Sequence, residues 1–535
     1  MTDSAFPLTA DREASARALG IRARDAVLAA IAASAAMLRI ALIFRYRIDS
    51  DETQHLHVVW GYTRGLLQYR DLFDNHMPLF HIASIPLLLM TGERPEALIA
   101  GRLLMLPIFA AIVLLAYRIA ASCNSKEAAM RATALAVLVP LFFLCSLEYR
   151  PDSAWAACWL GTLAILVGGP PTLRRSMTAG LLFGLALAIS AKSLLLAVSL
   201  AGAALLTMKL RALVQYAIVF AAAAMIPLVV IAIWFATHGA WQAFLEGTVT
   251  HNLVASEHPR RLLFLIPSIA ITAILARKIA ISDVLPETRK KRLFLLFAAA
   301  IYGAGMVSVW PIIESEHWLP FFPAAAAAIA PLLDNRFSKL VPLIMVVELV
   351  WIIRAGRPWN DQTAPAFDTI RQASALTSRN ETVIDLKGEM LFRRRAVRSV
   401  FEKITKKKIT TGLLQDTVAA DVVRNKTMVV LLDNASLPRE GRAFLRRNFI
   451  DVGLLRVAGM TIPKGERSFV IEVPAEYALV AQGNRFDGLL DGSPYTGPRA
   501  LGAGVHTITP SRAGPLTLLW SRAASMGLVP HHSST

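Results

Sequence analysis

Long apolar segments recur along the first two thirds of the chain, and they constrain its fold more than any other feature. A helix needs about 20 mostly apolar residues to cross the hydrocarbon core of a bilayer. We expect membrane helices at about eleven segments, namely 26–45, 97–117, 128–147, 153–169, 176–190, 193–208, 213–235, 262–276, 293–311, 317–333 and 340–354. Only 18% of the residues are charged, against roughly 25% in a soluble domain, so composition also indicates a mainly α-helical polytopic membrane protein.

The basic residues predict how these segments are oriented. Lys and Arg in short connectors mark the cytoplasmic side of a membrane. The first apolar segment is too long for the h-region of a cleaved signal peptide, so we expect a retained anchor. With residues 1–25 as a cytoplasmic tail, the basic connectors all fall on one side, at 118–131, 174–175, 209–211, 277–292 and 336–339. Membrane orientation therefore accounts for much of the net charge of +18, and we expect no nucleic-acid partner.

The pattern changes near residue 380, after the last predicted membrane segment. Short strand-like runs such as TVIDL (382–386) and TMVVLL (427–432) alternate with helical stretches such as EGRAFLRRNF (440–449). Two later runs, RSFVIEV and GVHTITP, stand among Gly and Pro residues typical of turns. We therefore predict a transmembrane catalytic domain at 26–355, with amphipathic helices in a first outer loop at 46–96. A mixed α/β outer domain with a β-rich end follows at 356–535.

Charged and titratable residues gather in four of the outer connections of this topology. Such groups are costly at membrane depth and tend to mark function there. They are Asp49, Asp51 and Glu52 after the first helix, Glu148, Arg150 and Asp152 after the third, Lys192 after the fifth, and Glu314, Glu316 and His317 before the tenth. A site built from them would offer carboxylates for acid–base chemistry and cations for an anionic ligand.

Two other interpretations of these residues remain open at this point. Each residue has a structural explanation: Pro151 can begin a helix with Asp152 in its first turn, and Lys192 can extend toward the interface. A secondary transporter could also line a solute or ion path with Asp51, Asp152 and Lys192. Transporters usually place such groups near the midplane, in broken helices of related repeats. Here the groups fall at helix ends and no repeat is evident, which favours an enzyme.

The histidines of the first outer loop raise the question of a metal site. His55, His57, His76 and His81 lie within 27 residues of one another. His55 and His57 are two positions apart and would not share a helix face, so we predict no histidine metal site. The sequence leaves open whether a divalent cation takes part, and no other cofactor is indicated.

Four motifs in order resemble a known family. They are DETQHLHVVWGYTRGLLQYRDLFDNHMPLFH at 51–81, EYRPD at 148–152, GLLFGLALAISAKSLLL at 180–196 and EHWLPFFP at 316–323. The sequence resembles polytopic GT-C glycosyltransferases that use polyprenyl-phosphate-linked sugars, among them protein O-mannosyltransferases and lipid A aminoarabinose transferases. The resemblance covers roughly residues 26–355. It implies transfer of a monosaccharide to an acceptor hydroxyl, with inversion, at the outer face of the bacterial inner membrane.

The resemblance also implies roles for individual residues. Asp51 would be the general base and Glu52 would support it or contact the acceptor, while Asp152 matches a second acidic position that shapes the site. The remaining substrate contacts would come from Arg150, Lys192, His317, Tyr69, His76 and Glu148, with Lys192 on the lipid phosphate. Many relatives carry a Lys where this chain has His76, so the cation facing the phosphate would instead be Arg150 or Lys192.

The partners implied by the resemblance are a polyprenyl-phosphate-sugar donor and an acceptor that is a lipid, a polysaccharide or a protein. Membrane lipids surround the helices, and we expect a monomer. The chemistry agrees with the residue types, because a carboxylate can accept the proton of a hydroxyl nucleophile. Lys or Arg can stabilise the charge on a departing phosphate.

Overall fold

The computed structural model describes residues 8–253, 259–333, 338–432, 436–481, 484–511, 514–528 and 530. The chain forms two compact units, each built from several stretches of sequence. The first, here called the helical unit, comprises Met1–Arg47, Arg102–Ile233 and Ala255–Asp361. The second, the mixed unit, comprises Ile48–Gly101, Trp234–Val254 and Gln362–Thr535. The first outer loop and the C-terminal region thus belong to the same unit.

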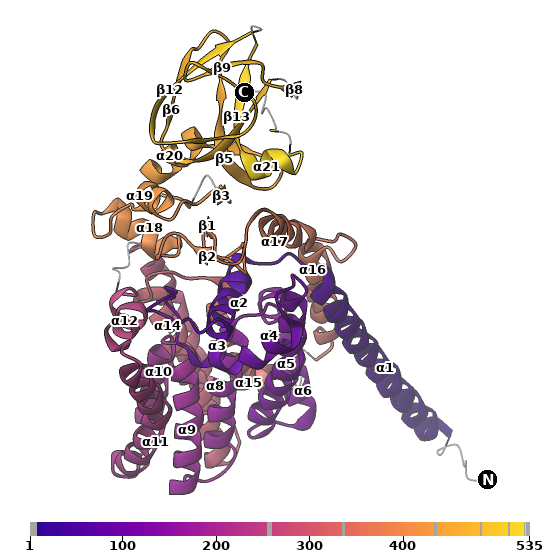
Figure 1. The fold of residues 1–535 in the computed structure, drawn as a ribbon. Coiled ribbons are helices and arrows are strands. Elements are labelled where there is room, and N and C mark those ends of the chain that lie inside the picture. The colour runs from indigo at the N-terminus through magenta and orange to yellow at the C-terminus, as the bar shows by residue number, and fades with distance from the viewer. Residues whose placement is uncertain are drawn as a thin grey trace, which may run out of the picture. The chain divides into compact units, whose positions relative to one another are not determined.

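The helical unit consists of helices (Figure 1), and the chain leaves it twice, between α1 and α5 and between α11 and η2, for the mixed unit. Two of its helices, α5 and α11, continue by a few residues into the mixed unit. Its elements are α1 (Leu8–Arg45), α5 (Ala97–Ala121), α6 (Lys126–Leu138), α7 (Pro140–Cys145), α8 (Pro151–Val167), α9 (Leu173–Ile189), α10 (Ser193–Thr207), α11 (Leu210–Thr237), η2 (Pro259–Phe264), α13 (Leu265–Ala280), α14 (Pro286–Ser308), η3 (Ser315–Trp318), α15 (Phe321–Ile329), η4 (Ala330–Leu333) and α16 (Val341–Gly356).

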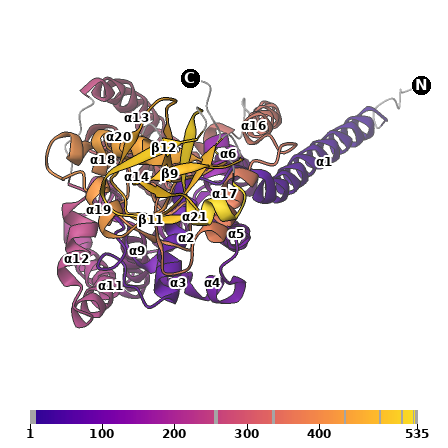
Figure 2. The same ribbon diagram turned by 45° about the horizontal axis from the view of Figure 1, so that its top comes forward.

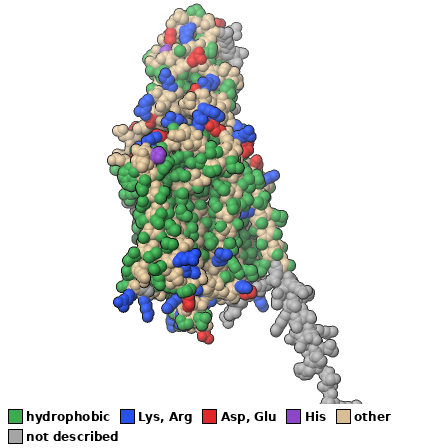
Figure 3. All heavy atoms as spheres, turned by 60° about the horizontal axis from the view of Figure 1, so that its bottom comes forward, with side chains coloured by type: hydrophobic (Ala, Val, Ile, Leu, Met, Phe, Trp, Pro, Cys, Tyr) green, Lys and Arg blue, Asp and Glu red, His purple; other side chains and the backbone are tan. Residues whose placement is uncertain are grey.

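The helices of this unit make the chain a multi-pass membrane protein. Among the described residues, five helical stretches are long and apolar enough to cross a bilayer: Ala26–Arg45, Ala97–Ala121, Leu213–Thr237, Arg261–Ala280 and Pro286–Ser308. Shorter apolar helices include Pro151–Val167 and Ser193–Thr207. Figure 3 shows hydrophobic side chains covering the sides of the helices, with Lys and Arg side chains gathered at one end. Such a belt matches the apolar interior of a bilayer.

The predicted membrane segments all contain helices, and two differ in detail from the prediction. The segment 128–147 is divided into α6 and α7 at Val139, because the residue before Pro140 is pushed out of the helical conformation. The segment 317–333 is divided among η3, α15 and η4. The closely spaced pair 176–190 and 193–208 is indeed two helices, α9 and α10, interrupted next to Lys192. Residues 1–7 of the predicted tail and Arg336 of one connector lie outside the described residues.

A buried arginine fixes the end of α1. Arg102 of α5 is fully buried and donates to the backbone carbonyls of Ile43 and Tyr46 at 3.3 and 2.8 Å, and also to that of Arg47. The last carbonyls of a helix lack partners within the helix. Their partial negative charge and the guanidinium therefore stabilise each other, which positions the chain where it leaves α1.

The mixed unit contains short helices and, among the described residues, two sheets. Its helices are α2 (Ser50–Thr63), α3 (Leu79–Ala83), α4 (Ile85–Thr91), α12 (Trp241–Leu245), η1 (Glu246–Thr250), α17 (Ala364–Leu376), α18 (Lys403–Thr410), α19 (Val418–Arg424), α20 (Arg439–Asn448) and α21 (Ser521–Ser525). Its strands are β1 (Thr382–Ile384), β2 (Arg394–Arg395), β3 (Val429–Val430), β4 (Phe449–Asp451), β5 (Arg456–Ile462), β6 (Ser468–Ile471), β7 (Ala475–Ala481), β8 (Asn484–Arg485), β9 (Gly488–Leu490), β10 (Ser493–Pro494), β11 (Arg499–Leu501), β12 (Gly504–Pro510) and β13 (Leu516–Trp520).

The larger sheet has the order β11-β7-β13-β5-β3-β1-β2, with β4 also pairing with β5 and β8 with β7. The pairs of β1 with β2 and with β3 are parallel, whereas the later strands pair antiparallel. The second sheet has the order β10-β9-β12-β6, and Figure 2 shows β9 beside β12. The predicted α/β pattern with a β-rich end is confirmed: the first three residues of TVIDL form β1, and GVHTITP forms β12.

Close packing of α9 against α11 depends on two glycines one turn apart. A Cβ atom added at Gly180 would lie 2.2 Å from the carbonyl oxygen of Phe220, and one at Gly184 would lie 2.4 Å from that of Ala224. Small residues at this spacing let the backbones of membrane helices approach closely. Gly202 of α10 differs, because its added Cβ would meet the end of the Ile301 side chain at 2.6 Å.

Gly180→Ala and Gly184→Ala should therefore each destabilise the protein by roughly 1–3 kcal/mol, the usual effect of overpacking. Gly202→Ala should have a smaller effect, because the Ile301 side chain can rotate away. Thermal unfolding in detergent measures all three variants. Equal losses of stability at the three positions would contradict this account of the α9–α11 contact.

Candidate functional site

Buried charged side chains meet at the start of α8 in the helical unit. Pro151 occupies the first helical position, where a residue without an N–H is tolerated, and Arg150 is the N-cap. Asp152 follows in the first turn, where the helix dipole favours a negative charge. The EYRPD motif thus begins α8 and also places two opposite charges, those of Arg150 and Asp152, at the N-terminal end of this helix.

Lys192 approaches this end of α8 from the break between α9 and α10. Its Nζ lies 2.5 Å from Oδ1 of Asp152 and 5.2 Å from the centre of the Trp155 ring. Trp155 is itself held by a 2.8 Å bond from its Nε1 to the hydroxyl of Ser193. The break between the two helices thus places the Lys192 side chain next to a carboxylate and an aromatic ring. The Lys192 side chain therefore does not extend freely into solvent.

Arg150 connects several carboxylates within the same cluster. It donates to Glu316 at 2.7 Å and to Glu148 at 3.3 Å, and its Nε lies 3.5 Å from Asp152. Arg47 approaches Glu148 at 3.5 Å. Each of the three cations Arg47, Arg150 and Lys192 therefore lies close to at least one of the carboxylates Glu148, Asp152 and Glu316.

His317 completes this cluster from η3. Its Nε2 lies 3.8 Å from Oε1 of Glu316, and its backbone carbonyl accepts a 2.5 Å bond from the Tyr302 hydroxyl. The backbone N–H of Glu314 donates to Nδ1 of His317 at 3.3 Å. The structure therefore brings five predicted residues together: Glu148, Arg150, Asp152, Lys192 and His317.

Asp51 and Glu52 lie in the first turn of α2 in the mixed unit. Asp49 is the N-cap, and its side chain accepts a bond from the Asp51 N–H at 3.0 Å. Glu52 is fully buried and accepts the Asp49 N–H at 3.0 Å, which completes a capping box. Glu52 is therefore engaged in holding the start of α2, whereas the Asp51 carboxylate projects from it.

The Asp51 carboxylate forms an ion pair with Lys387, a residue that sequence analysis missed. Lys387 donates from Nζ to Oδ1 of Asp51, and the two side chains are only 19% and 18% exposed. Burial lowers the pKa of Lys387, but the Asp51 carboxylate outweighs this effect and raises the pKa above its ordinary value. The mixed unit thus provides Asp51 with a cation from 336 residues farther along the chain.

A tight turn at residues 385–391 holds Lys387 in place. The Asp385 carboxylate accepts the N–H groups of Gly388 and Met390 at 3.1 and 2.9 Å. Gly388 has φ +123°, and an added Cβ would lie 2.7 Å from the Cβ of His57. His57 Nδ1 also contacts the carbonyl of Leu391 at 2.7 Å. Glycine is therefore required where this turn packs against α2.

Tyr69 and His76 lie in the loop between α2 and α3. Tyr69 is fully buried at φ 71°, packs against Phe235 and donates from its hydroxyl to the His76 carbonyl at 2.6 Å. His76 Nδ1 lies 2.8 Å from Oδ1 of Asp74. Tyr69 thus orders the loop, and His76 is engaged by a carboxylate.

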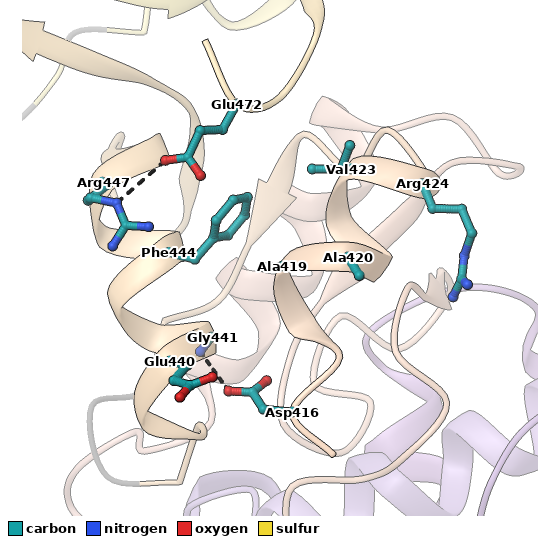
Figure 4. Close-up of a pocket in the computed structure, with 10 residues that line it drawn as sticks. All are labelled: Asp416, Ala419, Ala420, Val423, Arg424, Glu440, Gly441, Phe444, Arg447 and Glu472. Atoms are coloured by element: carbon teal, nitrogen blue, oxygen red, sulfur yellow. Dashed lines mark hydrogen bonds and ion pairs between the residues drawn. The ribbon is translucent and has the colours of Figure 1, made fainter. Parts of the chain in front are cut away.

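A surface pocket in the mixed unit contains none of the predicted residues. It lies between α19 and α20 (Figure 4) and is lined by residues including Asp416, Phe444, Arg447 and Glu472. Three of its charged groups have partners in the protein, since Arg447 lies 3.5 Å from Glu472 and Asp416 accepts the Gly441 N–H at 2.7 Å. We assign no function to this pocket.

Comparison with known proteins finds no matching protein-family model and no matching curated protein. Solved structures do match. ArnT from Cupriavidus metallidurans in the apo state has a TM-score of 0.59 and 10% identity, covering 82% of this chain and 98% of its own. Its structure bound to undecaprenyl phosphate has a TM-score of 0.53 and 11% identity, covering 81% and 97%. The Archaeoglobus fulgidus oligosaccharyltransferase complex with Zn and sulfate has a TM-score of 0.48 and 13% identity, covering 79% and 71%.

The chain has the GT-C fold. The resemblance found in the sequence motifs is thereby confirmed at the level of the fold, which extends over nearly the whole length of ArnT. The GT-C fold sets the arrangement of helices, whereas reaction and substrate depend on the individual side chains described above.

Glu389, within the turn at residues 385–391 that holds Lys387, provides a pH-dependent test of how this turn is held. Its Oε2 accepts the N–H groups of Leu386, Lys387 and Gly388 at 3.0, 2.8 and 3.2 Å. Its Oε1 is buried and has no hydrogen-bond partner among the described residues. Burial, together with the nearby Asp385 carboxylate, raises the pKa of Glu389 from 4.5 to about 7.

The folded protein therefore binds more protons here than the unfolded chain does between about pH 4.5 and pH 7, so stability should fall as pH rises through this window. Glu389→Gln cannot titrate and still accepts backbone N–H groups. The free energy of unfolding of Glu389→Gln minus that of wild type should therefore increase by roughly 1–3 kcal/mol when the pH is raised from about 5 to about 8. Thermal unfolding at the two pH values measures this, with the exposed Glu466→Gln as control. Parallel pH profiles for wild type and Glu389→Gln would contradict the prediction.

Proposed function

We propose that this chain is a membrane glycosyltransferase that moves a monosaccharide from a polyprenyl-phosphate donor to an acceptor hydroxyl, with inversion at the anomeric carbon. The GT-C fold supports this proposal, as does the undecaprenyl phosphate bound in one ArnT structure. The observation that carries it is the buried cluster around Arg150 and Lys192. A protein seldom retains such charges at membrane depth without a use for them.

Arg150 and Lys192 are the proposed ligands of the donor phosphate. Both are paired with carboxylates in the protein, Lys192 with Asp152 at 2.5 Å and Arg150 with Glu316 at 2.7 Å. An arriving phosphate oxygen offers either cation a comparable charge-assisted hydrogen bond. Asp152 and Glu316 would then hold the cations ready in the absence of donor and orient them in its presence.

Asp51 is the proposed general base. The acceptor oxygen attacks the anomeric carbon, the bond from that carbon to the phosphate oxygen breaks, and its electron pair leaves with the phosphate. The acceptor proton passes to the Asp51 carboxylate. Lys387 favours the ionised form of Asp51, which is the form that can accept a proton.

The other predicted residues receive supporting roles in the proposal. Glu52 holds the start of α2 through the capping box and so positions Asp51. Glu148 and His317 orient Arg150 and Glu316 within the cluster. Tyr69 and His76 order the loop between α2 and α3 through the bond from the Tyr69 hydroxyl to the His76 carbonyl.

The proposed orientation follows the positive-inside rule. It places the N-terminus in the cytoplasm and the residues after α16 outside the bacterial inner membrane. Donor sugars attached to a lipid phosphate could then meet the acceptor at the outer face. The transporter alternative would use Asp51, Asp152 and Lys192 differently, but no separate observation in either unit favours it.

Asp51→Asn should reduce transfer by about 10²- to 10⁴-fold, because it removes the proton acceptor and leaves an amide of the same shape. Mass spectrometry of envelope glycans and lipids from a deletion strain would first identify the missing sugar and acceptor. Complementation with the variant then measures its return. Near-normal transfer by Asp51→Asn, with normal expression, would remove Asp51 from the role of base.

Two companion variants separate loss of the base from loss of structure. Asp368→Asn changes an exposed carboxylate on α17 and should leave transfer unchanged. Lys387→Met keeps the Asp51 carboxylate but removes its cation, so transfer should persist while its acidic limb moves to higher pH. A merely structural role for Lys387 would lower transfer without this change in the pH profile.

Lys192→Met should weaken binding of undecaprenyl phosphate by roughly 10- to 100-fold, because hydrogen bonds between charged groups contribute about 1.5–3 kcal/mol. Calorimetric titration in detergent measures the affinity. The matched control is Lys209→Met, which changes an exposed lysine at the opposite end of α10. The double variant Lys192→Met/Asp152→Asn avoids leaving a buried carboxylate without its partner. Unchanged affinity in both Lys192 variants would exclude this residue from the donor site.

A further inference from the structure

Three ligand-forming side chains converge inside the mixed unit, and one of them, His55, follows Asp51 by one turn of α2. His55 belongs to α2, Asp74 to the loop before α3, and His81 to α3. All three are fully buried. One potential ligand atom from each lies within 4.8 Å of those from the other two. The sequence argument against a metal site compared His55 with His57, but the fold instead brings His55 to His81, 26 residues away.

The surroundings of His81 fix which of its nitrogens carries a proton. The Gln68 Nε2 donates to the His76 carbonyl at 3.2 Å, so the Gln68 Oε1 faces the Nδ1 of His81, also at 3.2 Å. The Tyr62 hydroxyl donates to the same Oε1 at 3.1 Å. His81 therefore carries its proton on Nδ1 and presents the lone pair of Nε2. A hydrogen bond at one ring nitrogen commonly prepares the other for a metal.

The lone pair of His81 Nε2 points at Nδ1 of His55, 2.9 Å away. In the absence of an ion, a proton on His55 Nδ1 bridges this contact. Two imidazole ligands of tetrahedral zinc lie about 3.3 Å apart, given Zn–N bonds of about 2.0–2.1 Å. An ion could therefore replace the bridging proton after a separation of the rings by a few tenths of an ångström, with His55 as its other neutral tautomer.

The Asp74 carboxylate is oriented by groups around it. Its Oδ1 accepts the His76 N–H at 2.6 Å and lies 2.8 Å from His76 Nδ1. Its Oδ2 receives a longer bond, 3.3 Å, from Gln54 Nε2. Oδ2 is thus the oxygen that can turn toward the two imidazoles. A fully buried carboxylate needs positively charged or hydrogen-bonding partners, and a divalent cation between Asp74 and the two imidazoles would be one such partner.

We propose that His55, Asp74 and His81 bind one divalent transition-metal ion, Zn²⁺ by the character of the donors, which ties α2 to α3. Two imidazoles and one carboxylate suit zinc, whereas Mg²⁺ and Ca²⁺ prefer sets of oxygen ligands. The alternative is a hydrogen-bonded histidine pair that serves packing alone. Both arrangements connect the same helices, so metal content and affinity distinguish them.

The test uses the full-length chain, purified in detergent with an affinity tag that lacks histidine. Inductively coupled plasma mass spectrometry should detect about one zinc ion per chain. After removal by a chelator, titration with Co²⁺ should restore one site and produce the visible absorption of tetrahedral coordination. Zn²⁺ should raise the Tm of the stripped protein, and Mg²⁺ should not. Wild type without zinc and without the Co²⁺ absorption would overturn the proposal.

Variants locate the ion. His81→Ala and His55→Ala should abolish stoichiometric binding, whereas His238→Ala, an exposed histidine of the same unit, should retain it. Gln68→Leu keeps all three ligands and should weaken binding about 10- to 100-fold by releasing the His81 tautomer. If the alanine variants fail to fold, the zinc content of wild type and the zinc affinity of Gln68→Leu still test the proposal. Wild-type affinity in all of these variants would place the ion elsewhere and overturn the assignment.

The metal proposal is independent of the proposed transferase activity. Asp51→Asn should bind one Zn²⁺ with the affinity of wild type, because Asp51 is not among the three ligands. A protein that transfers sugar but binds no metal would refute the metal site alone. A protein that binds metal at these residues but transfers no sugar would refute the proposed function alone.

Discussion

Charge buried among apolar helices is the constraint on which the helical unit depends. An ion removed from water is costly unless its partner lies within hydrogen-bond reach. Arg39 of α1 donates to the Ser146 carbonyl at 2.6 Å and lies 3.6 Å from the centre of the Phe109 ring. Arg102 takes the carbonyls at the end of α1, and Arg150 takes carboxylates. Each of these arginines contacts a segment that is distant from it in sequence. The contacts that stabilise the buried charge therefore also fix how the helices pack.

The same constraint explains how a structural cluster can also be a binding site. Folding already removes the Arg150 and Lys192 side chains from water and orients them. A phosphate that replaced one of their carboxylate partners would therefore meet hydrogen-bond donors that are already positioned. Preorganised donors need little rearrangement when charge develops on a leaving group. Ion pairs with Glu148, Asp152 and Glu316 also offset the cost of burying these cations. Stability and the proposed donor binding would thus use the same ion pairs.

Local sequence patterns predicted the features that local physics determines. Apolar length gave the helices, Pro151 and Asp152 marked the start of α8, and alternating strand runs indicated the β-rich end. The cluster of Glu148, Arg150 and Asp152 was found because its members are adjacent in sequence. Lys387 could not be found in this way, because nothing in DLKGE distinguishes its lysine from a solvated one. Its pairing with Asp51 depends on a turn formed by Asp385 and Glu389, and on contact with α2 that only the folded chain creates.

The histidines illustrate the same limit more sharply. Spacing along a helix correctly separates His55 from His57, since one faces His81 and the other contacts the Leu391 carbonyl. Spacing along one helix does not predict which side chains of another helix will contact it. Because α2 carries both His55 and Asp51, its position depends on the loop to α3 at one face and on the Lys387 turn at another. The C-terminal region is therefore part of what orients the proposed base, which explains why residues 48–101 and 362–535 form one compact unit.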